Sequence, residues 1–134
     1  MQRQDVYNRV KAHLHSMVGP ARDGSSCVYR GDSGSRCAVG CLIPDDKYDP
    51  AIEGLVVARI AENDVAESQA VNYARLADVL EQSGLPPTDR TLMALLARLQ
   101  QVHDNFDVTN IAETWHQYLD RRLPQVAATH GLEG

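Results

Sequence analysis

Three cysteines, and the histidines that could join them, are the residues of this sequence best suited to chemistry. Cys27, Cys37 and Cys41 lie close together in the chain, and His103 or His13 would add a fourth soft ligand for zinc. Nine and three residues separate successive cysteines, which is not the CxxC spacing of common zinc ribbons. Free cysteine is also among the most buried residue types, so we expect these thiols to pack in the core and predict no metal or other cofactor.

A thiol nucleophile is the second chemistry that these residues allow. Cys37 or Cys41 would need His103 as a base and Asp104 to orient the imidazole. Neighbouring residues of a helix point about 100° apart, so we expect Asp104 not to orient His103. We expect this histidine instead to lie at the C-terminal end of a helix, where it favours the helix dipole. The sequence therefore leaves catalysis open but favours a protein that is not an enzyme.

Acidic side chains follow the cysteines and raise the question of a hard-metal site. Four of them fall within nine residues: Asp45, Asp46, Asp49 and Glu53. Oxygen clusters of this kind bind Mg²⁺ or Ca²⁺, although the spacing is not that of an EF-hand. Each acid also suits a helix cap or a first helical turn beside a proline, and we favour that interpretation.

Two arginines flank the glycine-rich turn that precedes the acids. Arg30 and Arg36 could clamp an anion with their planar guanidinium groups. They could equally pair with Asp32, Asp45 or Asp46, and we expect such a pair to join this turn to a neighbouring helix. If the region forms a ligand pocket, we expect its lining to contain Arg30, Cys37, Cys41, Asp45 and His103. Further candidate binding residues are Tyr29, Arg36, Asp104 and Trp115.

The elements that must position these residues are mostly helices. Apolar residues recur at spacings of three and four, which predicts helices over residues 3–18, 51–61, 68–82 and 88–105 and a last one after a capping box at 110–113. We expect Val71 and Ile111 to face inward, Gly54 to break its helix or pack closely, Pro124 to kink the last helix and Gly131 to end it. Two β-compatible runs around the glycine-rich turn predict a hairpin.

The predicted fold is therefore mainly α-helical. We expect a single compact domain over residues 1–134, with five or six helices and one small inserted β-hairpin at about residues 27–40. Trp115 lies three residues before Tyr118 on one helix face. We expect both to be core residues, but an exposed Trp115 would indicate a binding hot spot.

Composition excludes several classes of function. The 134 residues are 43% hydrophobic, and 13 basic against 18 acidic side chains give a net charge of −5. That balance argues against a dedicated nucleic-acid or anionic-membrane surface. The chain has no run of about 18 apolar residues and no secretion signal at its start, and three cysteines fit a reducing compartment. We therefore expect a cytoplasmic protein, with no nucleic-acid or membrane partner; its oligomeric state stays open.

Short strings in the sequence resemble a family of small uncharacterised proteins of phages and bacteria. The strings are YRG at 29–31, CAVGCLIPD at 37–45, a tyrosine at 48, EG at 53–54, LQQVHD at 99–104 and a tryptophan at 115. The resemblance spans about residues 5–132. It implies a phage or mobile-element context and implies nothing about catalysis.

Two functions of different classes follow from these observations. The first is a non-catalytic accessory protein that binds a host or phage protein, for example as an inhibitor of a host defence system. The second is a small-molecule or nucleotide binding protein, or an enzyme, with its pocket between the hairpin and the helices.

Overall fold

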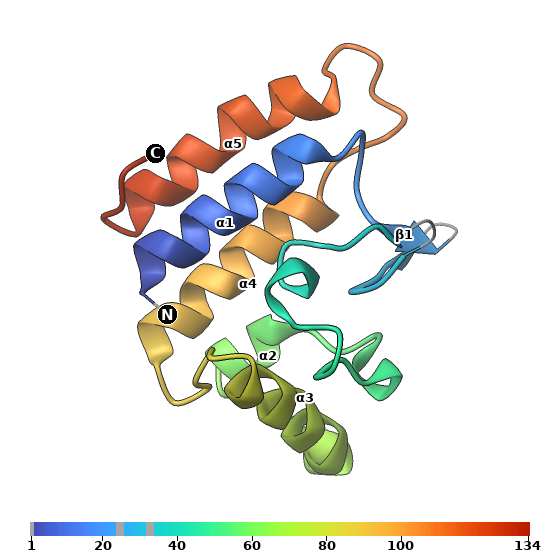
Figure 1. Ribbon diagram of the computed structural model, residues 1–134, viewed down its shortest axis with the longest axis vertical. Coiled ribbons are helices and arrows are strands. Elements are labelled where there is room, and N and C mark those ends of the chain that lie inside the picture. The colour runs from blue at the N-terminus through green and yellow to red at the C-terminus, as the bar shows by residue number, and fades with distance from the viewer. Residues whose placement is uncertain (1, 24–25, 32–33) are drawn as a thin grey trace.

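The computed structural model describes residues 2–23, 26–31 and 34–134, and for residues 23, 26 and 27 it describes the backbone only. Helices dominate it (Figure 1): α1 (Arg3–Ser16), α2 (Val57–Ala61), α3 (Ala70–Gln82), α4 (Arg90–Asp104) and α5 (Trp115–Thr129). Short 3-10 helices lie between them: η2 (Gly40–Leu42), η3 (Pro50–Ile52) and η4 (Glu67–Gln69). The prediction of a mainly helical chain is confirmed.

The β-hairpin predicted over about residues 27–40 is wrong. Within the described residues, a two-residue ladder joins β1 (Arg22–Asp23) to β2 (Ser26–Cys27), and one isolated bridge joins Arg30 to Arg36. The carboxylate of Glu53 accepts the backbone N–H groups of Arg30 and of the residue before it. These donors are therefore used by a side chain from outside the segment, and among its described residues the Arg30–Arg36 bridge stands in place of the predicted ladder.

Three helices form the body that the other elements pack against. In Figure 1, α1 lies between α4 and α5, and each of the three contacts the other two. We call α1, α4 and α5 the helical bundle. α2 packs against α4, and α3 packs against η3. The two chain ends also meet, because the Gln4 side chain exchanges hydrogen bonds of 3.0 and 2.9 Å with the Glu133 backbone.

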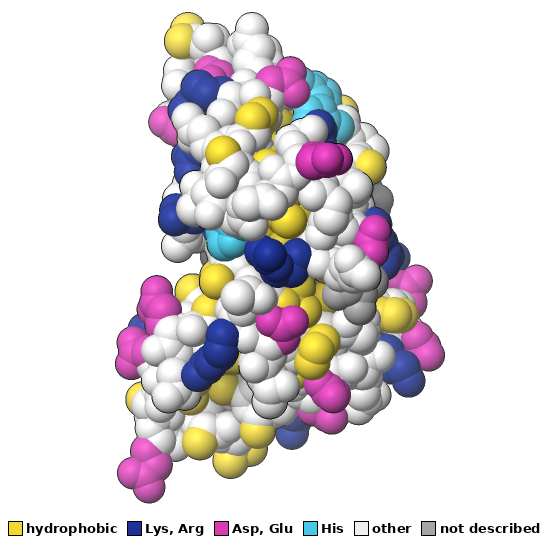
Figure 2. All heavy atoms as spheres, turned by 90° about the vertical axis from the view of Figure 1, so that its left-hand side faces the viewer, with side chains coloured by type: hydrophobic (Ala, Val, Ile, Leu, Met, Phe, Trp, Pro, Cys, Tyr) yellow, Lys and Arg dark blue, Asp and Glu magenta, His cyan; other side chains and the backbone are white. Residues whose placement is uncertain are grey.

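Charge is distributed unevenly between the two halves of the molecule. Residues 43–89, which contain α2 and α3, carry ten acidic and three basic side chains, whereas the rest of the chain carries eight acidic and ten basic ones. In Figure 2, acidic side chains are spread over the lower half, and Lys and Arg side chains lie along the left edge of the upper half. The net charge of −5 therefore comes from the α2–α3 half.

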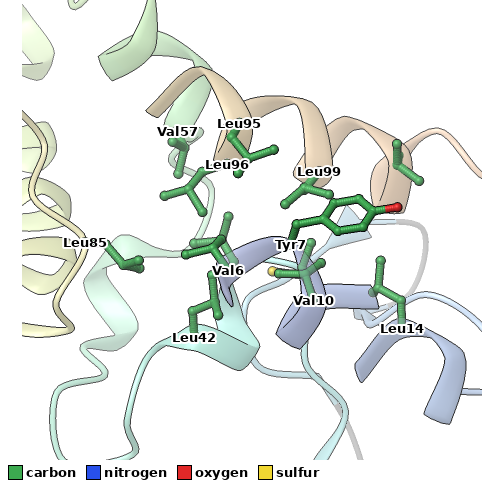
Figure 3. Packing of buried hydrophobic residues seen from close by; sticks show 14 of the residues in the cluster. Val6, Tyr7, Val10, Leu14, Leu42, Val57, Leu85, Leu95, Leu96 and Leu99 are labelled. Carbon is green, nitrogen blue, oxygen red and sulfur yellow. The ribbon is translucent and has the colours of Figure 1, made fainter. Parts of the chain in front are cut away.

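The hydrophobic core runs through the helical bundle and continues into the loop that precedes α2. Figure 3 shows Tyr7 of α1 beside Leu99 of α4, and Val6 of α1 beside Leu42 of η2. All four side chains are buried. The Tyr7 hydroxyl donates to the Leu123 carbonyl at 3.1 Å, so its polar end is satisfied inside the core. This cluster explains why the apolar spacing of the sequence predicts the helices well.

Helix starts differ from the predictions, most of all over residues 51–61, where the structure has the 3-10 helix η3 and then only the five-residue α2. Asp89, not Thr88, is the N-cap of α4 and accepts a backbone N–H of the first turn. α5 begins with a capping box formed by Thr114 and Gln117, not at Asn110. Several residues near each start can act as caps, so sequence alone does not select among them.

Two predicted inward-facing residues are exposed, whereas the glycine predictions are confirmed. Val71 is 75% and Ile111 is 101% exposed, because one lies on the outer face of α3 and the other in the connection before α5. Gly54 has a φ of 84° and separates η3 from α2. Gly131, with a φ of 67°, follows α5, and Pro124 lies inside α5 without ending it.

Candidate functional site

The region with most of the predicted site residues is the loop over residues 29–54, where it meets the end of α4. Glu53 is its centre. One carboxylate oxygen accepts the Tyr29 N–H at 2.8 Å, and the other accepts the Arg30 N–H at 3.1 Å and the Tyr48 hydroxyl at 2.6 Å. Burial, and then the hydrogen bond to Glu53, raise the pKa of Tyr48 well above its usual range. Glu53 therefore ties together three parts of one loop.

Arg30 uses its guanidinium group in the same region. It donates to the Gly40 carbonyl at 2.6 Å and to the Ile43 carbonyl at 2.8 Å, and it lies over the Tyr48 ring at 4.8 Å. Its pair with Asp45 is longer, at 3.3 Å. Arg30 is thus a structural crosslink whose hydrogen bonds are directed at the protein itself, not at an external anion.

Arg36 and Asp45 form the exposed edge of this region. Arg36 donates to Asp45 at 2.7 Å, and the Asp45 side chain is 76% exposed. The predicted pairing of the two flanking arginines with an acid is thus present, with Asp45 as the shared partner, but Asp45 lies in a turn and not in a helix as expected. Asp32, another acid considered for this pairing, lies outside the described residues. Exposed pairs of this kind contribute little stability.

Gly40 explains why the loop can close on itself. A Cβ atom at this position would lie 2.2 Å from the Tyr29 carbonyl oxygen. Two backbone segments therefore pass at a distance that only glycine permits. We call Tyr29, Arg30, Gly40, Tyr48 and Glu53 the loop network.

The two described thiols are engaged within this loop. Cys37 is buried and its sulfur accepts the Gly40 N–H at 3.2 Å, while Cys41 donates to the Ala38 carbonyl at 3.1 Å. Burial raises the pKa of Cys37 to about 12 and that of Cys41 to about 11. Both are protonated near neutral pH, so neither is prepared to act as a nucleophile.

His103 does not complete a catalytic set with these thiols. It is fully buried, and its Nε2 accepts the Ala21 N–H at 2.8 Å, so its Nδ1 carries the ring proton and donates to Asp104 at 2.7 Å. The expectation that Asp104 cannot orient its neighbour is wrong. Nδ1 is the ring nitrogen nearer the backbone, within reach of the short carboxylate at the next position.

Gln100 joins this histidine pair to the loop. Its amide donates to Asp104 at 2.7 Å, and its carbonyl accepts the Val39 N–H at 3.1 Å. Sequence reasoning did not select Gln100 or Glu53 as individual site residues. The signal that could have found them was their place in the LQ and EG strings.

The zinc hypothesis gains no support from the described side chains. They contain no group of three His, Cys, Asp or Glu residues able to hold a metal ion. His13 donates to the Arg36 carbonyl at 2.7 Å, and both nitrogens of His103 are occupied. The side chain of Cys27 lies outside what the structure describes.

Trp115 belongs to the core. Its side chain is buried and its indole N–H donates to the Leu14 carbonyl at 2.9 Å. Its ring packs edge-on against His103 and Phe106 and stacks with Tyr118. Trp115 is therefore not available as the exposed anchor of a protein interface.

A small cleft opens where the loop network meets α4. It has a volume of about 120 Å³, and its lining includes Tyr29, Cys37, Gln100 and Asp104. Ligand pockets commonly measure about 300–1,000 Å³, so this cleft is too small for a nucleotide.

No family model, curated protein or solved structure gave a significant match to this chain. Among the described residues, none of the helices combines the length and apolar character needed to cross a membrane.

Proposed function

We propose that this protein works by binding a protein partner and catalyses no reaction itself. The observation that supports this proposal is the internal use of the reactive groups. The thiols of Cys37 and Cys41 and both nitrogens of His103 are hydrogen-bonded within the fold. Function then depends on the shape and charge of the surface, because no activated nucleophile or free base is present among these groups.

The proposed setting is the cytoplasm of a bacterium that carries a phage or another mobile element. The resemblance of the YRG, CAVGCLIPD and LQQVHD strings to small phage and bacterial proteins supports this setting. Three cysteines in a short chain are compatible with a reducing compartment. An accessory protein that inhibits a host defence system belongs to this class.

The test is reconstitution of a complex with a purified partner. Tagged protein is used to capture partners from a bacterial lysate, and each candidate is purified and mixed with it. We expect a complex near one-to-one ratio by size exclusion with light scattering. Failure of every captured protein to form such a complex would contradict the proposal.

Two substitutions distinguish this proposal from a second candidate function, in which a small ligand binds in the cleft beside α4. That candidate is favoured by the position of Asp104 in the lining of the cleft, where a small cationic ligand would be attracted. Cys37→Ser and Asp104→Asn, both in the cleft lining, should leave the partner's affinity unchanged if surface binding is the function. Loss of function in these variants with an unchanged melting temperature would instead favour the cleft.

A further inference from the structure

A second hollow lies between α4 and α5, and its lining includes no residue of the loop network. Arg98 of α4 lines it, and α5 contributes Arg122, Gln125, Val126 and Thr129. The α5 positions follow the i, i+3, i+4, i+7 spacing of one helix face. The volume is about 140 Å³. Two guanidinium groups, an amide and a hydroxyl therefore line one small space.

These two arginines differ from the other arginines in their partners. Five of them form an ion pair with a carboxylate and three donate to a backbone carbonyl: Arg30, Arg36, Arg59, Arg75 and Arg121 in the first group, and Arg3, Arg22 and Arg90 in the second. Arg9 has a partner as well. Within the described part of the chain, neither Arg98 nor Arg122 has a hydrogen bond or ion pair, and the Arg122 guanidinium carbon lies 5.7 Å from the centroid of the Tyr118 ring.

The surroundings of the hollow leave its positive charge uncompensated. Burial, followed by the charges of Arg98 and Arg3, lowers the pKa of His130 at the end of α5. Glu113 is an acid within electrostatic reach of Arg122, but both of its oxygens accept from Arg121 at 2.8 Å.

Favourable interaction with the helix dipole does not account for both arginines. That effect is confined to about the last turn of a helix. Arg122 lies in the middle of α5, which ends at Thr129, and its guanidinium group gains nothing from the free carbonyls there. Arg98 is exposed and Arg122 is half-buried, so both guanidinium groups are accessible to an acceptor from outside the protein.

We propose that the hollow between α4 and α5 binds a phosphate group, either free phosphate or a phosphomonoester. Arg98 and Arg122 would each present a planar donor fork, the geometry that matches phosphate oxygens. The Gln125 amide and the Thr129 hydroxyl offer further donors. A volume of about 140 Å³ accommodates one such group, and two positive charges favour a dianion over a single carboxylate.

The test is an NMR titration with inorganic phosphate at constant ionic strength. We expect saturable shifts of the Arg98 and Arg122 backbone and Nε–H signals. Arg98→Gln and Arg122→Gln should each weaken binding by about tenfold or more, the effect of losing one charge-assisted hydrogen bond. Arg75→Gln removes the same charge from an exposed site on α3 and should leave the affinity unchanged.

A further variant and a second probe identify the source of the phosphate and test whether the binding is only non-specific attraction of an anion to positive charge. Arg98→Lys keeps the charge but loses the fork, so it should bind more weakly than the parent protein. A phosphoserine tripeptide that binds more tightly than inorganic phosphate would identify a phosphorylated segment as the source, and equal affinity would identify free phosphate. Absence of saturation with both probes, or an equal loss in Arg75→Gln, would overturn the proposal.

Discussion

The loop network and the helical bundle are held together by different forces. In the bundle, α1, α4 and α5 bury aliphatic and aromatic side chains against one another, and the few polar ends present, such as the Tyr7 hydroxyl, find a carbonyl. In the loop network, the Glu53 carboxylate and the Arg30 guanidinium bind backbone groups directly. One region is fixed by apolar burial and the other by charge-assisted hydrogen bonds.

The comparison shows that side chains with reactive groups can serve to stabilise the fold. A loop without regular secondary structure leaves backbone donors and acceptors unpaired, and buried unpaired groups cost free energy. Glu53, Arg30 and Gln100 satisfy such groups in residues 29–43. The polar residues that suggested chemistry in the sequence therefore replace the missing hydrogen-bond ladder.

The largest effect that we expect concerns the thiol of Cys37, which belongs to the loop but is buried in the core. In a Cys27→Ser/Cys41→Ser background, reaction of native protein with a disulfide reagent at pH 8 should be about a thousandfold slower than in urea. The reason is that burial raises the pKa from its ordinary value of 9.0 to about 12. Comparable rates in the two states would show that the loop opens freely.

The same thiol gives a pH dependence of stability. Between pH values of about 9 and 12 the folded state holds the Cys37 proton and the unfolded state loses it. This contribution to the free energy of unfolding is thus complete below pH 9 and declines as the pH rises toward 12. Urea unfolding of the single-cysteine protein and of its Cys37→Ala variant across this range isolates the contribution.

Gly40→Ala should break the loop network while leaving the bundle's own contacts in place. The new Cβ atom would meet the Tyr29 carbonyl at 2.2 Å, so we expect a loss of about 3 kcal/mol in the free energy of unfolding. Urea unfolding measures it. Gly19→Ala is the control, since nothing lies within 4 Å of that Cβ position. Equal stability of the two variants would contradict the close approach.

Glu53→Ala should have a smaller effect, about 2 kcal/mol, because two N–H groups and the Tyr48 hydroxyl lose their acceptor. Glu62→Ala, at an exposed acid near the end of α2, is the matched control and should change stability by less than about 0.5 kcal/mol. Hydrogen exchange of the Arg30 amide in Glu53→Ala should increase more than exchange within α4. A uniform increase would show that the two regions unfold as one.

Helices were predictable from the sequence because their signal is local. Spacings of three and four among Val6, Val10 and Leu14 define a buried face that α1 does possess. The exposed Val71 and Ile111 show the limit of this reasoning, since a periodic position is buried only where another element covers it. The predicted hairpin was reduced to one bridge between Arg30 and Arg36, and the distant Glu53 carboxylate accepts the N–H groups of Tyr29 and Arg30.

The sequence indicated which residues could lie near one another in the candidate site, but not which hydrogen bonds they form. The sequence offered Tyr29, Cys37 and Asp104 among its candidate binding residues, and in the structure these three line one cleft. It did not reveal that His103 accepts from Ala21, or that Gln100 bridges α4 and the loop. Those bonds join residues more than 60 positions apart, and no local pattern encodes them.

By itself the sequence determined the helical class, the glycine breaks and the acidic balance, because apolar periodicity, backbone freedom and charge are properties of nearby residues. Only the tertiary structure decided which polar groups are used internally and which arginines are left without an acceptor. Hydrogen bonding depends on distances of about 3 Å between atoms that the chain brings together from remote positions. Candidate functional residues are therefore recognised by whether the fold gives their polar groups a hydrogen-bond partner.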